Sequence, residues 1–267
     1  PPRSTLFPYT TLFRSLLPAL FAASLLPAAA VAAPSSDRPV YELRTYTATP
    51  GNGANVVARF RNHTVKLFEK HGMVNVGYWV PAEEKDGAAD KLIYLLEHRS
   101  RDAAKASWKS FVADPAWKEV VKQTEANGKI VAKVESVYLA PTAYARSMQA
   151  GNGAGAPRVF EMRTYVAAEG KMADLDARLR DHAMPLFAKH GITSLGYFHP
   201  ADADKGAGST LIYFLAHRSR EAAAASWKAF RDDPAWARAR VENEKGGRVT
   251  SKVTGVLLVP TDFSKLR

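Results

Sequence analysis

The feature that most constrains this chain is an internal repeat with a constant spacing. The segment 41–46 (YELRTY) returns as 160–165 (FEMRTY), an offset of 119 residues that holds without an insertion to the end of both copies. The same offset pairs HRSR at 98–101 with 217–220, SWK at 107–109 with 226–228, and DPAW at 114–117 with 233–236. An offset without insertions preserves the order of every element, so the chain contains two copies of one module.

Each copy has one pattern of strands and helices. Alternating apolar residues predict strands, an apolar stripe at helical spacing predicts a first helix, and serine and Asp-Pro caps predict the starts of two more. The first copy predicts strand 40–47, helix 55–70, strands 74–80 and 92–98, helices that begin after Ser100 and Asp114, and strand 133–139. This β-α-β-β-α-β order is the ferredoxin-like unit.

A single sheet of this kind is covered by helices on one face and leaves the other face open. The two copies are therefore expected to pack sheet against sheet around a common core, as two subunits of a dimer would. The predicted fold class is α+β, with two tandem ferredoxin-like modules that form a pseudo-dimeric α/β barrel. We predict a first domain over residues 38–142, a linker over 143–157 and a second domain over 158–262.

The first 33 residues are expected to lie outside both domains. Residues 1–15 look like a translated sequencing adaptor, and residues 16–33 are apolar and end in small residues, as in a secretory signal peptide. That run is shorter than the about 20 residues of a membrane span and contains Pro18 and Pro27, which argues against a stable membrane anchor. The sequence thus predicts a periplasmic or secreted bacterial protein.

Composition excludes several classes of chemistry. The chain has no cysteine, which excludes disulfides, a thiol nucleophile and a cysteine-ligated metal. Its formal net charge of +11 comes from lysine and arginine scattered among acidic residues, which favours solvated helix faces and no nucleic-acid partner, and leaves an anionic ligand open. The sequence has no phosphate-binding loop and no G-x-S-x-G elbow, so nucleotide use and serine hydrolysis are disfavoured.

Several short motifs give the chain a family resemblance. ELRTY (42–46), LFEKHG (67–72), GYW (77–79), HRS (98–100) and SWKSFVADPAW (107–117), with their second copies, resemble the NIPSNAP family. The resemblance implies tandem domains of the dimeric α/β-barrel version of the ferredoxin-like fold. It implies no established catalytic residues; related barrels include small cofactor-free monooxygenases and haem-handling enzymes, which is an analogy of fold alone.

A polar stripe on the first strand of each copy is the main candidate site. Alternation along a strand places Glu42, Arg44 and Tyr46 on one face. The second copy repeats the stripe as Glu161, Arg163 and Tyr165. One interpretation is a Glu–Arg pair that neutralises itself at the junction of the sheets and fixes their register. The other is a pocket in which the arginine holds a carboxylate or another anion.

Histidines and tyrosines near that stripe are further candidates. His63 and His182 fall on the apolar stripe of the first helix, so they are expected to face the sheet as core residues or, with Tyr94 or Tyr213, as acid–base or ligand-orienting groups. His98 and His217, at a strand end, are expected at the rim, where they are either exposed to solvent, which we favour, or in contact with a ligand. The histidine spacing predicts no metal site. No cofactor is predicted, although a haem with one axial histidine needs no motif and stays open.

Four tryptophans, Trp108, Trp117, Trp227 and Trp236, are expected to pack helices against the sheet.

The function we expect is binding of a small, anionic or aromatic ligand in the barrel, through the stripe residues and through His63, Tyr94, His182 and Tyr213. The alternatives are a cofactor-independent monooxygenase or isomerase, and a non-catalytic scaffold. An enzyme should bring acid and base groups together in a closed cavity, whereas a binding or structural protein would pair each glutamate with its arginine. Assembly into a homo-oligomer is left open.

Overall fold

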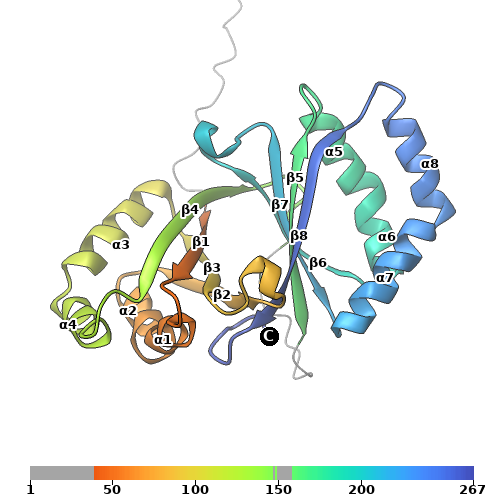
Figure 1. Ribbon diagram of the computed structural model, residues 1–267. Coiled ribbons are helices and arrows are strands. Elements are labelled where there is room, and N and C mark those ends of the chain that lie inside the picture. The colour runs from red at the N-terminus through yellow and green to blue at the C-terminus, as the bar shows by residue number, and fades with distance from the viewer. Residues whose placement is uncertain (1–38, 147, 149–157) are drawn as a thin grey trace, which may run out of the picture. The chain divides into compact units, whose positions relative to one another are not determined.

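The computed structural model describes residues 39–146, 148 and 158–267, whose strands form a closed barrel in the order β1-β3-β2-β8-β5-β7-β6-β4 (Figure 1). The predicted adaptor segment 1–15, the predicted signal peptide 16–33 and most of the predicted linker lie outside the described residues. None of the helices described is long and apolar enough to cross a membrane.

Both modules have the same elements in the same order. The first consists of β1 (Val40–Ala48), α1 (Gly53–Arg59), the π-helical turn η1 (Phe60–Thr64), α2 (Val65–Lys70), β2 (Val74–Pro81), the 3-10 turn η2 (Glu84–Asp86), β3 (Lys91–His98), α3 (Arg101–Ala113), α4 (Pro115–Thr124) and β4 (Val131–Pro141). The second consists of β5 (Val159–Ala167), α5 (Met172–Arg178), the π-helical turn η3 (Leu179–Ala183), α6 (Met184–Lys189), β6 (Thr193–Pro200), the 3-10 turn η4 (Ala203–Lys205), β7 (Thr210–His217), α7 (Arg220–Asp232), α8 (Pro234–Asn243) and β8 (Thr250–Pro260). The predicted β-α-β-β-α-β order is confirmed in both.

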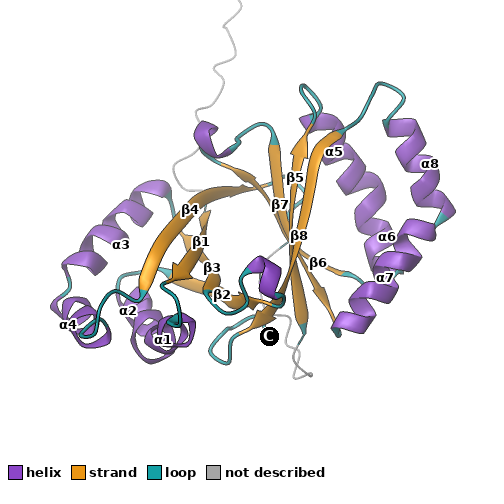
Figure 2. Ribbon diagram, in the orientation of Figure 1, coloured by secondary structure: helices purple, strands orange, loops and turns teal. Residues whose placement is uncertain are grey.

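Antiparallel pairing holds each module together and also joins the two. Within a module the first strand lies between the third and fourth strands, and the second strand pairs with the third. Between modules, β2 pairs with β8 from Trp79↔Pro260 onward, and β4 pairs with β6 from Leu139↔Pro200 onward. These two short junctions close the predicted pseudo-dimeric barrel, with the helices outside it (Figure 2).

The barrel interior is filled with apolar side chains. Tyr41 and Leu43 of β1 point inward, where they meet Trp79, Phe160 and Phe214 in one buried cluster. Separate apolar clusters lie between each half of the sheet and its own helices. Because side chains alternate along a strand, the polar residues of β1 and β5 point out of the barrel, toward the helices.

The predicted helix 55–70 contains a π-helical turn that the sequence pattern does not reveal. It lies at matching positions, η1 in one module and η3 in the other. A π-turn inserts one extra residue and rotates the rest of the helix around its axis. Thr64 and Ala183, which each follow the histidine of their module, are therefore buried, whereas His63 is only partly buried and His182 is exposed. The expectation that the two histidines face the sheet is wrong for this reason.

The segment after the last strand of each module packs against the other module. After β4, the backbone N–H of Thr142 donates to the carbonyl of Tyr197; after β8, that of Thr261 donates to the carbonyl of Tyr78. Leu266 then enters the barrel core and is fully buried there. Each module is thus held by a segment of the other.

Replacing Leu266 with alanine should lower the free energy of unfolding by about 2–5 kcal/mol, because a fully buried leucine leaves a cavity in the shared core. Urea unfolding of the full chain measures this. The control is Val241→Ala on α8, whose side chain is 69% exposed and should cost less than about 0.5 kcal/mol. Equal losses for the two variants would contradict the anchoring role of the C-terminal segment.

Candidate functional site

The polar stripe of the first module is organised around the carboxylate of Glu42, which is 1% exposed. Its Oε1 accepts hydrogen bonds from Arg44 and Ser136, each at 2.6 Å. Its Oε2 accepts from the indole of Trp108 at 2.6 Å and lies 3.1 Å from Nε2 of His98. Four groups from β1, β3, β4 and α3 thus meet at one carboxylate.

These partners keep Glu42 ionised although it is buried. Burial by itself raises the pKa of Glu42, but the hydrogen bond from His98, the charge of Arg44 and the bonds from Ser136 and Trp108 outweigh it. The net effect lowers its pKa to about 2. The carboxylate is therefore a fixed negative charge within the fold.

His98 and His217 are not at an exposed rim as expected; both are buried. His98 ends β3, but α3 continues directly from that point and covers it, and the neighbouring strand β1 brings Glu42 within reach. His217 contacts Glu161 in the same way, at 3.1 Å. The last residue of β3 or β7 is therefore buried in the folded module, although it ends its strand.

The second module repeats the arrangement with one donor fewer. Glu161 accepts from Arg163 at 2.5 Å and from Trp227 at 2.6 Å, in addition to its contact with His217. Burial raises the pKa of Glu161, but these hydrogen bonds and the charge of Arg163 lower it on balance. The position of Ser136 is taken by Gly255, where even a Cβ would come within 2.8 Å of the Glu161 carboxylate. The Glu–Arg pairing is thus present in both modules, and neither glutamate is free to hold a ligand.

Each arginine of the stripe also stacks on a tryptophan. The guanidinium of Arg44 lies 4.2 Å from the Trp108 ring, and that of Arg163 lies 4.4 Å from the Trp227 ring. Arg163 in addition donates to the hydroxyl of Tyr165 at 3.3 Å. Its Nε is buried and has no hydrogen-bond partner among the described residues. Arginine and aromatic rings together form a flat, positively charged surface.

In the second module this surface opens into a cavity of about 390 Å³. The cavity lies between the sheet, on its β5 and β8 side, and helices α5, α7 and α8. It is lined by Arg163, Tyr165, Arg178, Trp227, Phe230, Arg231, Trp236, Arg240, Glu244, Arg248, Thr250 and Val253. The lining thus includes five arginines and four aromatic side chains. Its one carboxylate, Glu244, is already paired with Arg178 at 3.1 Å.

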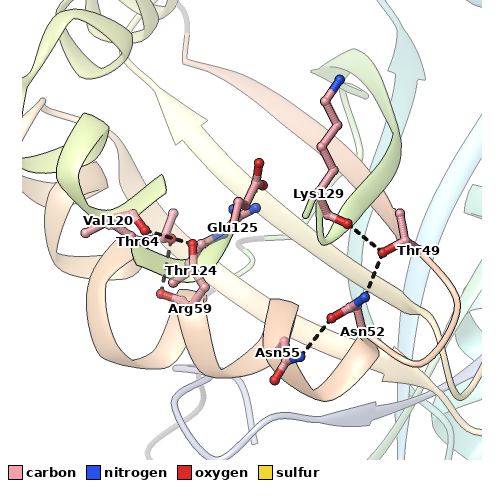
Figure 3. A network of polar contacts seen from close by, with 9 residues as sticks. All are labelled: Thr49, Asn52, Asn55, Arg59, Thr64, Val120, Thr124, Glu125 and Lys129. Atoms are coloured by element: carbon pink, nitrogen blue, oxygen red, sulfur yellow. Dashed lines mark hydrogen bonds and ion pairs between the residues drawn. The ribbon is translucent and has the colours of Figure 1, made fainter. Parts of the chain in front are cut away.

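The corresponding region of the first module is tied together by hydrogen bonds (Figure 3). Arg59 pairs with Glu125 at 2.8 Å, as Arg178 does with Glu244. The Thr49 hydroxyl donates to the backbone carbonyl of Lys129, whose side chain points away from the network. The Arg–Glu pair between the first helix and the end of the fourth is therefore common to both modules.

The other predicted site residues lie apart from the cavity. The Tyr213 ring stacks on Tyr197 at 5.1 Å and packs edge-on against Tyr165 at 5.3 Å; its buried hydroxyl has no hydrogen-bond partner among the described residues. Burial raises the pKa of Tyr213 well above its ordinary value, and the same holds for Tyr94. Neither of the two tyrosines lines the cavity.

Of the predicted candidates, only Arg163 and Tyr165 line this cavity, while Glu161 orients Arg163. Sequence reasoning missed Arg178, Arg231, Arg240 and Arg248, and treated the tryptophans as packing residues alone. A usable signal was present, because several of these arginines replace other residue types of the first copy.

In the part of the chain that the structure describes, no three histidine, aspartate or glutamate side chains are grouped as metal ligands would be.

Replacing Glu42 with glutamine should lower the free energy of unfolding at pH 7 by about 3 kcal/mol, since Arg44 and His98 lose a charged partner. The folded pKa of about 2 lies below the ordinary 4.5, so ionised Glu42 stabilises the fold above pH 4.5, and this contribution is lost as the pH falls toward 2. The stability difference between wild type and Glu42→Gln should therefore shrink over that range. Urea unfolding at a series of pH values measures it.

The matched variant is Glu161→Gln. It should act in the same direction with a smaller loss, because Glu161 has no counterpart of the Ser136 hydrogen bond. A wild-type-to-variant difference that stays constant from pH 7 to about pH 3 would show that neither carboxylate is linked to folding in this way.

Comparison with known proteins gives the same two-module division. Residues 41–146 and 160–265 each match the NIPSNAP family model. No protein with a curated description matches the chain. Similar solved structures include an anthrone oxidase-like protein, with TM-score 0.56 and 14% identity over 86% of this chain and 94% of that one.

Two more are each described as a "putative monooxygenase". The one from Fusobacterium nucleatum has TM-score 0.53 and 8% identity over 84% of this chain and 92% of its own. The one from Lactobacillus acidophilus has TM-score 0.51 and 13% identity over 84% and 94%. At such identities these structures share the fold alone. The family match, by contrast, covers both modules, and the chain therefore belongs to the NIPSNAP family, as a tandem of two NIPSNAP domains.

Proposed function

We propose that this protein binds a small ligand that carries an anionic group on an aromatic ring, in the cavity of the second module. The observation that supports this is the lining itself, in which five arginines face four aromatic rings and the single carboxylate is already paired. Guanidinium groups hold carboxylates and phosphates through two parallel hydrogen bonds, and flat aromatic side chains bury a flat ligand. A volume of about 390 Å³ suits a small molecule.

This location differs from the barrel interior that the sequence led us to expect. The interior is occupied by the apolar cluster around Trp79 and Phe214. The cavity lies on the opposite face of the sheet, under the helices. The apolar segment 16–33 supports the further proposal that the ligand is met outside the cytoplasm.

Binding is favoured over catalysis by the state of the ionisable groups. General acid–base chemistry needs a group that can give or take a proton within reach of the substrate. The lining residues include no histidine and no aspartate, Glu244 is ion-paired with Arg178, and the one remaining candidate, the Tyr165 hydroxyl, accepts a hydrogen bond from Arg163. This argues against an isomerase, which needs an acid and a base.

Replacing Trp236 with alanine should weaken binding of an aromatic anion, such as naphthalene-2-carboxylate, about tenfold, which corresponds to about 1.4 kcal/mol. The matched control is Trp117→Ala. Trp117 packs on Phe111 at 4.6 Å, as Trp236 does on Phe230 at 4.6 Å, so both variants lose similar packing. Isothermal titration calorimetry should show the binding defect only for Trp236→Ala. Equal defects would point to a general loss of structure, and an absence of binding to the wild type would favour a scaffold.

A second candidate is a cofactor-independent monooxygenase, which the names of the three similar structures favour. Such chemistry needs an electron-rich substrate anion that reacts directly with dioxygen, and a guanidinium such as that of Arg163 would stabilise the anion. For anthrone, one dioxygen would give anthraquinone and one water, with the substrate supplying the electrons.

An oxygen electrode tests this second candidate with anthrone as the probe. An enzyme should consume one dioxygen per anthrone well above the rate without protein, and Trp236→Ala should slow it more than Trp117→Ala. Uptake at the uncatalysed rate would leave binding as the function.

A further inference from the structure

The two modules differ at the positions that line the cavity. The arginine and tyrosine of the first strand, the tryptophans and phenylalanine of the helices, and the Arg–Glu pair are the same in both. Four lining positions change, each to a more polar or more strongly hydrogen-bonding residue in the second module: Val112 to Arg231, Val121 to Arg240, Lys129 to Arg248 and Val131 to Thr250. The shared set is therefore the structural frame, and the changed set distinguishes the cavity lining of the second module from the equivalent positions of the first.

The three additional arginines are exposed, at the mouth of the cavity. Arg163 and Arg178 are each ion-paired with a glutamate. Arg231, Arg240 and Arg248, by contrast, form no ion pair with a carboxylate in the described part of the chain. Asp232 is next to Arg231 in sequence, but it pairs with Lys228 at 2.5 Å. These three charges thus remain available to a ligand.

Three guanidinium groups around one cavity repel one another, because arginine stays charged at any physiological pH. A ligand with a single negative charge offsets only part of this repulsion. A ligand with two or more negative charges offsets more of it and can engage several arginines at once. The first module has valine at two of the three positions, and Val112 is 58% exposed. A charged ligand would gain no contact from either valine.

We infer that the second module alone holds the ligand, one per chain, and that the ligand is an aromatic ring with two or more negative charges, such as a benzene polycarboxylate. This inference rests on the proposed function and specifies its ligand class and stoichiometry. The first module keeps the buried carboxylate, the Arg–Trp stack and the Arg–Glu pair. Its role is to complete the barrel.

Calorimetry of the wild-type chain at low ionic strength tests the inference with three probes: benzoate, benzene-1,3-dicarboxylate and benzene-1,3,5-tricarboxylate. Tricarboxylate should bind at one molecule per chain and at least tenfold more tightly than benzoate. Added salt should weaken the tricarboxylate more than the benzoate, since screening acts on each charge pair.

Two triple variants exchange the three positions between modules. Arg231→Val with Arg240→Val and Arg248→Lys gives the cavity of the second module the residues that the first module has at these positions. It should bind benzoate nearly as the wild type does but lose the preference for tricarboxylate. Val112→Arg with Val121→Arg and Lys129→Arg makes the reverse change and should raise the stoichiometry to two. All six positions lie at or near the surface, and a thermal unfolding curve checks that each variant is folded.

The outcomes separate the inference from the proposed function. Two tricarboxylates per wild-type chain, or equal affinity for all three probes, would overturn the inference and leave ligand binding in place. A reverse variant that still binds one tricarboxylate would overturn the claim that these three positions decide which module is occupied. If neither benzoate nor the polycarboxylates bind the wild type, the proposed function itself fails.

Discussion

The buried carboxylate of the first strand in each module is the interaction on which the rest of the structure depends. In the first module it accepts hydrogen bonds from the first, third and fourth strands and from α3, so one ionised group fixes how the helix layer sits on the sheet. A buried charge is costly unless every partner is in place. That requirement explains why the glutamate, the arginine, the histidine and the tryptophan occur together in both copies.

The same carboxylate determines what the arginine can do. With one edge of the guanidinium on the glutamate and its face on a tryptophan ring, Arg163 is held in one orientation beneath the helices. Structural pairing and the ligand binding that we propose are therefore two parts of one arrangement and not alternatives. The pair neutralises the glutamate, and the helices above it decide whether a cavity remains.

Duplication in one chain gives the two copies different freedom. Both are needed to close the barrel, since β2 pairs with β8, β4 pairs with β6 and the interior core takes side chains from each module. The helix surfaces under no such constraint can diverge. Val112 and Val121 against Arg231 and Arg240 are differences of this kind, on the outer layer and away from the junctions.

The sequence by itself determined the module, its repetition and its family. Strand alternation, helix caps, short motifs and a constant offset can all be read along the chain without knowledge of the fold. It also placed Glu42, Arg44 and Tyr46 on one face of a strand. Only the tertiary structure decided which side of the barrel that face meets, since alternation separates two faces but does not say which one is enclosed. The π-turn that exposes His182, the helix that covers His98 and the convergence of arginines from α5, α7 and the loop before β8 are also three-dimensional facts. The covering of His98 and the convergence of the arginines depend on contacts between residues that are far apart in the chain.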